Sequence, residues 1–167
     1  MIDWGLLLRI LHIVGTALGV GSTTLLEIFS IKFGRDGKID FAEHEVLRIC
    51  VTVLRIGLVI LAFSGFGLLV MWRLRLLGPE VFYAPRFLAK ITIILVLLLV
   101  AMLVNFKLIN FKLGSAISTT SWYTVLVLGM WRRLEASYFL IMFAYVILIG
   151  IVYFSLEYIR KIVARRQ

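Results

Sequence analysis

The chain has 167 residues, of which 62% are hydrophobic, and its formal net charge is +9. This length leaves room for one domain, which we expect to cover residues 1–167. The composition excludes an ordinary soluble domain, in which about 45 to 50% of residues are apolar. Apolar runs of about twenty residues predict membrane-spanning helices, and they exclude a β-barrel, whose strands alternate over about ten residues.

Four apolar runs predict an all-α integral membrane protein, a four-helix transmembrane bundle. The expected spans are residues 4–31, 45–72, 85–106 and 136–158. Many of the Lys and Arg residues lie near the ends of these spans or in loops, which is typical of contact with phospholipid headgroups. We therefore expect these basic residues to contact the lipid bilayer and not to bind nucleic acid.

The segment between the third and fourth spans has two unusual features. Residues 105–114 contain a duplicated Asn-Phe-Lys-Leu unit, which predicts an interfacial extension of the third span that ends at Gly114. The apolar stretch from Trp122 to Trp131 is ten residues long, about 15 Å as a helix and too short to cross a bilayer. We therefore expect 117–131 to form a short interfacial segment. With four crossings both termini share one face, and the basic tail indicates the cytoplasmic face.

The loop from Asp36 to Glu43 is similar to the second half of an EF-hand calcium loop, in which a glycine makes the turn and a final glutamate binds the ion. In that register Lys32 and Gly34 occupy positions that need ligands. A turn followed by a capping box of Asp40 and Glu43 explains the same residues without a missing ligand. We favour the turn and cap.

A polar face runs along the first span. Five of its residues follow one another at steps of three or four: His12, Thr16, Gly19, Thr23 and Glu27. Such spacing places them on one side of a helix, which we expect to point inward. Gly15 and Gly19 form a small-xxx-small pair that allows another helix to approach closely.

Glu27 lies near the far end of the first span, where Arg48 and Arg55 enter on the second. The structural interpretation is an ion pair between Glu27 and one of these arginines. The functional alternative is a polar path of Glu27, Arg55 and Asn105 through a small ion or metabolite transporter or channel. Because four helices enclose too narrow a pore, that alternative requires a homodimer or a larger ring.

His12 and Lys90 lie roughly 12 Å and 8 Å from the same membrane face, at about 1.5 Å per residue, and can meet inside the bundle. Arg9 and Arg86 lie at the same end and would form a basic rim. An imidazole beside such a rim suits a flat, apolar, anionic cofactor, and haem b fits this description, with His12 as the metal ligand and Met71 as one candidate for the sixth position. The alternative is a hydrogen bond from His12 to a neighbouring helix.

Short motifs resemble a known family. Residues 9–15 read Arg-Ile-Leu-His-Ile-Val-Gly and residues 87–90 read Phe-Leu-Ala-Lys, which is similar to the HemJ-type protoporphyrinogen oxidases and their CopD-like relatives, small bacterial membrane proteins. Residues 132–135, Arg-Arg-Leu-Glu, are similar to that family's Arg and Asn-Glu motif. The family's proline, arginine and tyrosine-histidine signature after the first helix is absent. The resemblance implies that His12 and Lys90 are the functional pair.

Three functions follow as hypotheses. The first is a haem-binding or redox-associated protein of the bacterial plasma membrane, the second is the transporter, and the third is a scaffold whose polar groups only hold helices together. No phosphate-binding glycine loop and no nucleophile elbow is present in the sequence. The sequence therefore leaves open whether the protein is an enzyme.

Overall fold

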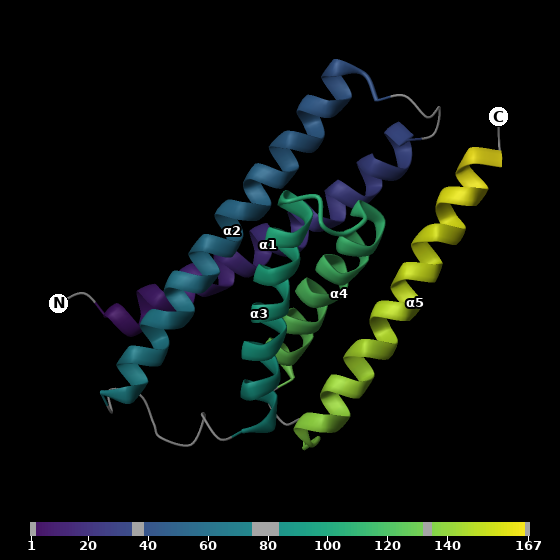
Figure 1. Cartoon of the computed structure of the whole chain (residues 1–167). Coiled ribbons are helices and arrows are strands. Elements are labelled where there is room, and N and C mark those ends of the chain that lie inside the picture. The colour runs from purple at the N-terminus through teal and green to yellow at the C-terminus, as the bar shows by residue number, and fades with distance from the viewer. Residues whose placement is uncertain (1–2, 35–38, 75–83, 132–134, 166–167) are drawn as a thin grey trace.

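The computed structural model describes residues 3–34, 39–74, 84–131 and 135–165. Within these ranges the chain forms helices and no strand, and Figure 1 shows them running back and forth along one bundle. The helices are α1 (Trp4–Phe33), α2 (Phe41–Arg73), α3 (Pro85–Asn105), α4 (Phe111–Met130) and α5 (Tyr138–Arg165). The predicted all-α bundle is therefore confirmed.

Four of the helices, α1, α2, α3 and α5, are long and apolar enough to cross a membrane, and they match the four expected spans. Their start points follow local chemistry. The side chain of Asp3 accepts a hydrogen bond of 3.1 Å from the backbone of Leu6 and caps α1. Pro85 opens α3 in the first turn, where its missing N–H has no helical partner to lose.

α4 differs from the short interfacial segment expected at 117–131. It contains 20 residues, about 30 Å of helix, because it begins at Phe111, inside the second copy of the duplicated unit. α3 ends at Asn105, Lys107 takes the left-handed conformation with φ 57°, and the side chain of Asn110 caps α4 by accepting from the backbone of Lys112 at 3.0 Å. The duplication is thus a tight helix connection, and Gly114 lies inside α4 rather than at a helix end.

α4 lies inside the bundle, packed against α1, α3 and α5. Its residues Ala116, Ser121 and Trp122 have no exposed surface. The hydroxyl groups of Ser121 and Tyr145 of α5 form a buried hydrogen bond of 2.7 Å, which satisfies both polar groups in an apolar interior. A helix of this length was not expected, because the apolar stretch from Trp122 to Trp131 is by itself too short to cross a bilayer.

The extra lengthwise helix changes where the chain ends. The two termini lie at opposite ends of the bundle, with the end of α5 beside the end of α1 (Figure 1). The physical reason is that α4 runs along the bundle as well, so that five helices follow one another and α5 ends at the far end. The expectation from the sequence that both termini share one membrane face stays a prediction.

Close approach of α1 and α2 depends on glycine, as the small-xxx-small pair predicts. A Cβ added to Gly15 would lie 2.8 Å from the backbone N of Leu61, and one added to Gly57 would lie 2.9 Å from the backbone N of Gly19. Ordinary carbon contacts are about 3.5 to 4.0 Å. The two backbones can therefore touch only where these side chains are absent.

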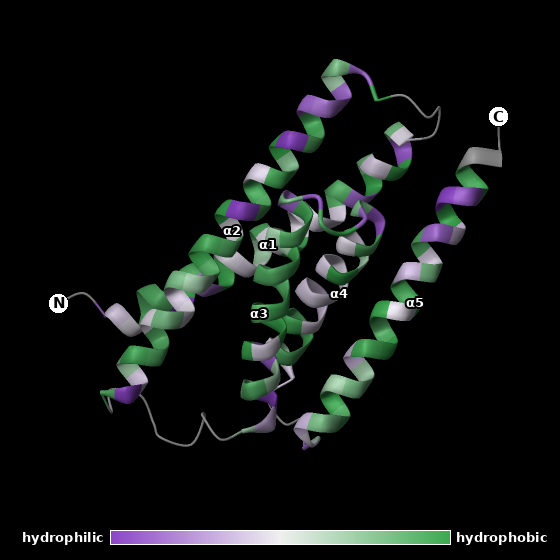
Figure 2. Cartoon of the chain, in the orientation of Figure 1, coloured by the Kyte–Doolittle hydropathy of each residue, from purple (hydrophilic) through white to green (hydrophobic). Residues whose placement is uncertain are grey.

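The outer surface is largely hydrocarbon. Large apolar side chains are widely exposed, among them Phe63 at 74% and Phe139 at 81%, and Figure 2 shows hydrophilic residues gathered toward the helix ends and the connections. Water would not tolerate such an apolar surface, whereas lipid tails match it. The protein is therefore an integral membrane protein in contact with the bilayer.

Candidate functional site

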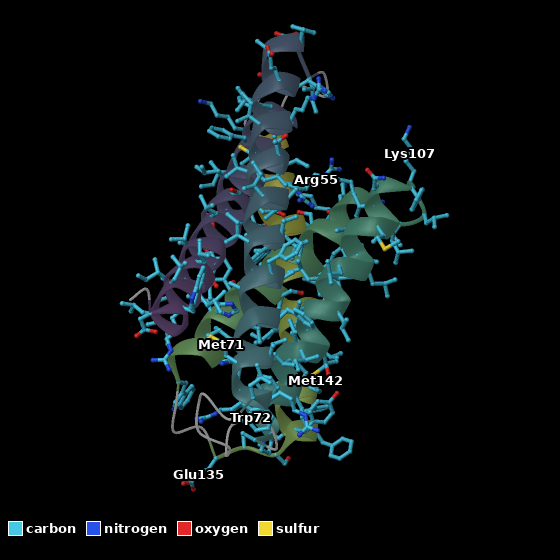
Figure 3. All side chains as sticks on the ribbon, turned by 90° about the vertical axis from the view of Figure 1, so that its left-hand side faces the viewer. Arg55, Met71, Trp72, Lys107, Glu135 and Met142 are labelled. Atoms are coloured by element: carbon cyan, nitrogen blue, oxygen red, sulfur yellow. The ribbon has the colours of Figure 1, made fainter. Side chains whose placement is uncertain are left out.

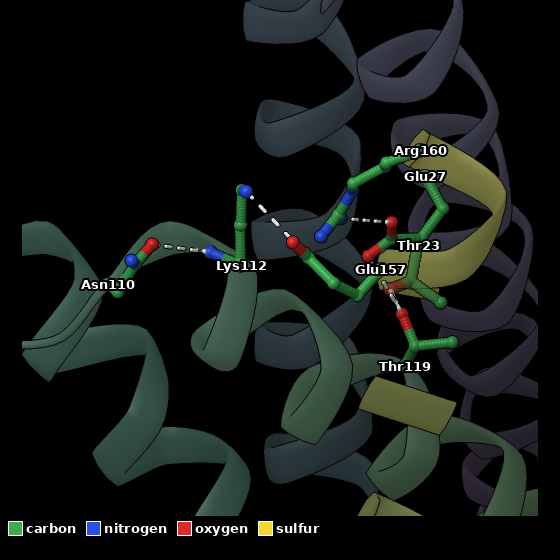
Figure 4. A network of polar contacts seen from close by, with 7 residues as sticks. All are labelled: Thr23, Glu27, Asn110, Lys112, Thr119, Glu157 and Arg160. Atoms are coloured by element: carbon green, nitrogen blue, oxygen red, sulfur yellow. Dashed lines mark hydrogen bonds and ion pairs between the residues drawn. The ribbon is translucent and has the colours of Figure 1, made fainter. Parts of the chain in front are cut away.

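An ion pair joins the first and last helices near one end of the bundle (Figure 4). Arg160 of α5 lies 3.1 Å from the Oε2 atom of Glu27 on α1, and the two side chains are only 16% and 8% exposed. The hydroxyl of Thr119 in α4 donates to Oε1 of Glu27 at 3.4 Å and lies the same distance from the hydroxyl of Thr23. Three helices therefore share one buried carboxylate.

The predicted pairing of Glu27 with Arg48 or Arg55 is wrong. Glu27 pairs with Arg160 because the fifth pass brings the end of α5 to this place. Arg55 instead donates a hydrogen bond of 3.2 Å to the side chain of Asn105 at the end of α3. Two members of the predicted polar path, Arg55 and Asn105, are thus in contact, while Glu27 lies on the α1 side.

A cavity of about 860 Å³ opens at this end of the bundle. Its walls come from α2 on one side and α5 on the other, α1 forms its floor, and the start of α4 closes its lower edge. It exists because α2 packs mainly along α1, whereas α5 packs against α4, α3 and α1. α2 and α5 therefore leave a space between them at the level of the Glu27–Arg160 ion pair and the Arg55–Asn105 hydrogen bond.

The lining of this cavity is strongly basic. One carboxylate, Glu157, lines it, and it lies 3.5 Å from the Nζ atom of Lys112. The cationic side chains in the wall are Arg48, Arg55, Lys112, Arg160 and Lys161. Even when Glu27 and Glu157 each neutralise one cation, three positive charges remain. Among the described residues, Arg48 and Lys161 have no ion-pair partner, so their charges are available to an anion.

The floor of the cavity is mixed. Leu26 and Ile31 of α1 present hydrocarbon, and Ser30 lies beside them. The hydroxyl oxygen of Ser30 is buried and has no hydrogen-bond partner in the described part of the chain, although Thr16 and Thr24 of the same helix both bond to backbone carbonyls. A buried hydroxyl without a partner costs free energy, so Ser30 is a candidate contact for a polar ligand group.

The predicted site around His12 lies elsewhere along α1. The His12 ring points into the bundle, with Nδ1 3.2 Å from the hydroxyl of Ser64 on α2, and Lys90 is close enough for the two charges to interact. Ser64 donates its own hydrogen to the carbonyl of Ile60 at 2.7 Å. The Nδ1 atom of His12 is therefore the donor toward Ser64, and Nε2 keeps its lone pair.

The donor chemistry of this second place suits haem. An imidazole oriented through Nδ1 and free at Nε2 is the form that ligates iron, and the charge of Arg86 acts on Lys90 beside it. The Cε1 side of the ring packs on α2, where a Cβ on Gly65 would lie 3.4 Å from Cε1 of His12. His12 and Lys90 line neither the cavity between α2 and α5 nor a second, apolar cavity between α4 and α5.

The remaining members of the predicted haem site are Arg9 and Met71. Arg9 is exposed on α1, and Met71 lies near the lower end of α2 (Figure 3). Neither residue lines the two cavities. No group of three or more His, Cys, Asp or Glu side chains is placed for a metal in the described ranges.

The calcium-like loop is described only in part, because residues 35–38 lie outside the described ranges. The capping box is present: the side chain of Glu43 accepts from the backbone of Asp40 at 3.0 Å, and the Asp40 side chain accepts in return at the third position of α2. The predicted cap is therefore confirmed, and it engages two of the three carboxylates, those of Asp40 and Glu43, that the calcium interpretation uses.

No protein-family model, curated protein or solved structure matches this chain. The fold and composition define the class, an integral membrane helical bundle, and the resemblance to the HemJ-type family stays a prediction. Lys112, Arg160 and Lys161 were not expected as site residues, because lysine and arginine near helix ends are typical headgroup anchors. The signal that finds them is the length of 111–130, which moves the end of α5 to the other end of the bundle.

Proposed function

We propose that the protein is a membrane-embedded binding protein for an anionic ligand, with its site in the cavity between α2 and α5. One observation carries this proposal: five cationic side chains and one carboxylate line a space of about 860 Å³. Charges in such a partly enclosed place attract an anion more strongly than the same charges in bulk water, because the surrounding dielectric constant is lower.

Binding at one membrane surface fits the packing better than a continuous path. Below the cavity, Leu61, Leu97 and Trp122 form a buried apolar cluster with exposed fractions of 5% or less. An ion crossing the bundle would have to displace this close-packed apolar cluster. The transporter hypothesis therefore needs either a movement of helices or a second copy of the chain, whereas binding needs neither.

The test measures the thermal unfolding temperature of the detergent-solubilised protein with phosphate, with citrate and with an anionic lipid, each compared with chloride at equal ionic strength. At least one anion should raise the temperature, since a ligand that binds only the folded state stabilises it. The double variant Arg48→Gln/Lys161→Gln should lose this rise. The control Lys107→Gln removes an exposed cation from the α3–α4 connection, outside the cavity (Figure 3), and should keep it.

Two outcomes would contradict anion binding. One is that no anion changes the unfolding temperature, which is what the scaffold hypothesis expects. The other is an equal rise in the cavity variant and in Lys107→Gln, which would indicate a general salt effect. Neither Arg48 nor Lys161 has an ion pair among the described residues, so their loss should leave the fold itself intact.

Haem binding at His12 is the second candidate, and one observation favours it: the ring is oriented through Nδ1, with Nε2 left as a possible ligand. The expected result is a Soret band in the purified protein that His12→Ala removes. A colourless preparation that takes up no added haemin would exclude it. Location in a bacterial plasma membrane, and any redox role, are proposals that rest on the family resemblance alone.

A further inference from the structure

We infer that the anion bound in the cavity is the phosphate headgroup of an anionic membrane lipid, whose acyl chains lie along α2. This inference rests on the proposed function and names its ligand class. A soluble anion and a lipid headgroup can both carry a negative charge into the cavity. The position of the cavity in the bundle and the surface of α2 below it favour the lipid.

The cavity lies at the height expected for lipid phosphates. α3 and α4 contain 21 and 20 residues, each about 30 Å long, which matches the thickness of the hydrocarbon core. The connection between them therefore marks one surface of the membrane, and Lys107 projects from it (Figure 3). Arg55 is tied to this level by Asn105 at the end of α3, and Lys112 in the first turn of α4 lines the cavity.

α2 carries a surface that suits a lipid below these cations. Six residues at steps of three or four share one face of this helix: Arg48, Thr52, Arg55, Val59, Phe63 and Phe66. The upper three line the cavity. The lower three are exposed hydrocarbon, at 53%, 74% and 66%. The face thus changes from cationic to apolar at Arg55, as a bound phospholipid changes from phosphate to acyl chain.

A lipid can enter this place from the side. α5 packs mainly against α4, α3 and α1, so in the described part of the chain α2 and α5 do not pack closely against each other across the cavity. A phosphate there would meet the charges of Arg48 and Lys161, which have no ion-pair partner among the described residues. A soluble anion would use only the charges, whereas a phospholipid would use both the charges and the apolar face of α2 directly below them.

The test compares three ligands that share phosphate and differ in their chains: phosphatidylglycerol, glycerol 3-phosphate and inorganic phosphate. Binding of each to the purified full chain in neutral detergent is measured by native mass spectrometry and by thermal unfolding, with phosphatidylcholine as the uncharged lipid control. Phosphatidylglycerol should bind most tightly. Arg48→Gln/Lys161→Gln should weaken it roughly 25-fold, since about 1 kcal/mol for each cation at a membrane surface is a factor of about five. Lys107→Gln should change its affinity less than two-fold.

A chain variant tests the apolar half of the site. Phe63→Ala should weaken phosphatidylglycerol several-fold and leave inorganic phosphate unaffected. Its control is Phe143→Ala, which removes a similarly exposed ring, 66%, from α5 outside both cavities. If glycerol 3-phosphate or phosphate binds as tightly as the lipid in a manner that depends on Arg48 and Lys161, the anion site stands and the lipid inference is overturned. If none of the three phosphate compounds shows binding that depends on Arg48 and Lys161, the lipid inference is overturned. The proposed function then stands only if citrate still stabilises the protein.

Discussion

The substitution Gly19→Ala tests the unexpected position of α4 directly. Gly19 faces the buried ring of Trp122, and a Cβ placed on Gly19 would lie 2.5 Å from the Cε3 atom of that ring and overlap its other edge carbons. If α4 lay on the membrane surface, as its composition predicts, nothing would stand in the way of this methyl group. The same substitution would then be harmless.

The expected cost can be worked out from these distances. Carbon atoms at rest lie about 3.5 to 4.0 Å apart, so α1 and α4 would have to separate by about 1 Å, or the ring would have to leave its rotamer. Trp122 has no exposed surface and therefore little room to move. Overpacking of this kind costs about 1 to 3 kcal/mol in the free energy of unfolding.

A matched control separates this cost from helix propensity. Gly21 is on the same helix, and a Cβ there would meet nothing within 4 Å, so Gly21→Ala reports only the propensity gain of up to about 1 kcal/mol. Reversible unfolding in mixed micelles should place Gly19→Ala about 1 to 3 kcal/mol below Gly21→Ala. In a Trp122→Leu background this difference should shrink. Equal stabilities of the two alanine variants in the wild-type background would refute the buried position of α4.

Three further results are expected. Arg160→Met should cost about 3 kcal/mol, because it leaves the buried carboxylate of Glu27 without its cation, whereas Lys112→Met, at a half-exposed pair, should cost at most about 1 kcal/mol in the same unfolding assay. Ser121→Ala and Tyr145→Phe should each cost about 1 kcal/mol and be strongly non-additive, since each removes the same hydrogen bond. Epitope tags on the two termini should be accessible from opposite sides of sealed vesicles; access from one side would contradict the arrangement in Figure 1.

The inward face of α1 was predictable from spacing, and the structure confirms it: Thr23 and Glu27 are 2% and 7% exposed, and Gly15 lies against the α2 backbone. The partner of Glu27 was not predictable. Arg160 is 133 residues away in the chain. The end of the bundle at which it lies depends on whether residues 111–130 form a helix that runs along the bundle. One misjudged helix therefore reversed the end of the bundle at which the tail was placed.

The sequence alone determined the class of this protein and the approximate bounds of its long helices, because hydrocarbon demands apolar runs of about 20 residues and helices satisfy their own backbone groups. It also determined the capping box at Asp40 and the close approach at Gly15, which are local effects of particular residue types. Tertiary structure decided the place of α4, whose serines and threonines become tolerable in the interior only when neighbouring helices and their own backbone carbonyls supply hydrogen bonds, as Tyr145 does for Ser121. It also decided which charges meet, because a cavity of five cations forms only when helices distant in sequence end at the same height.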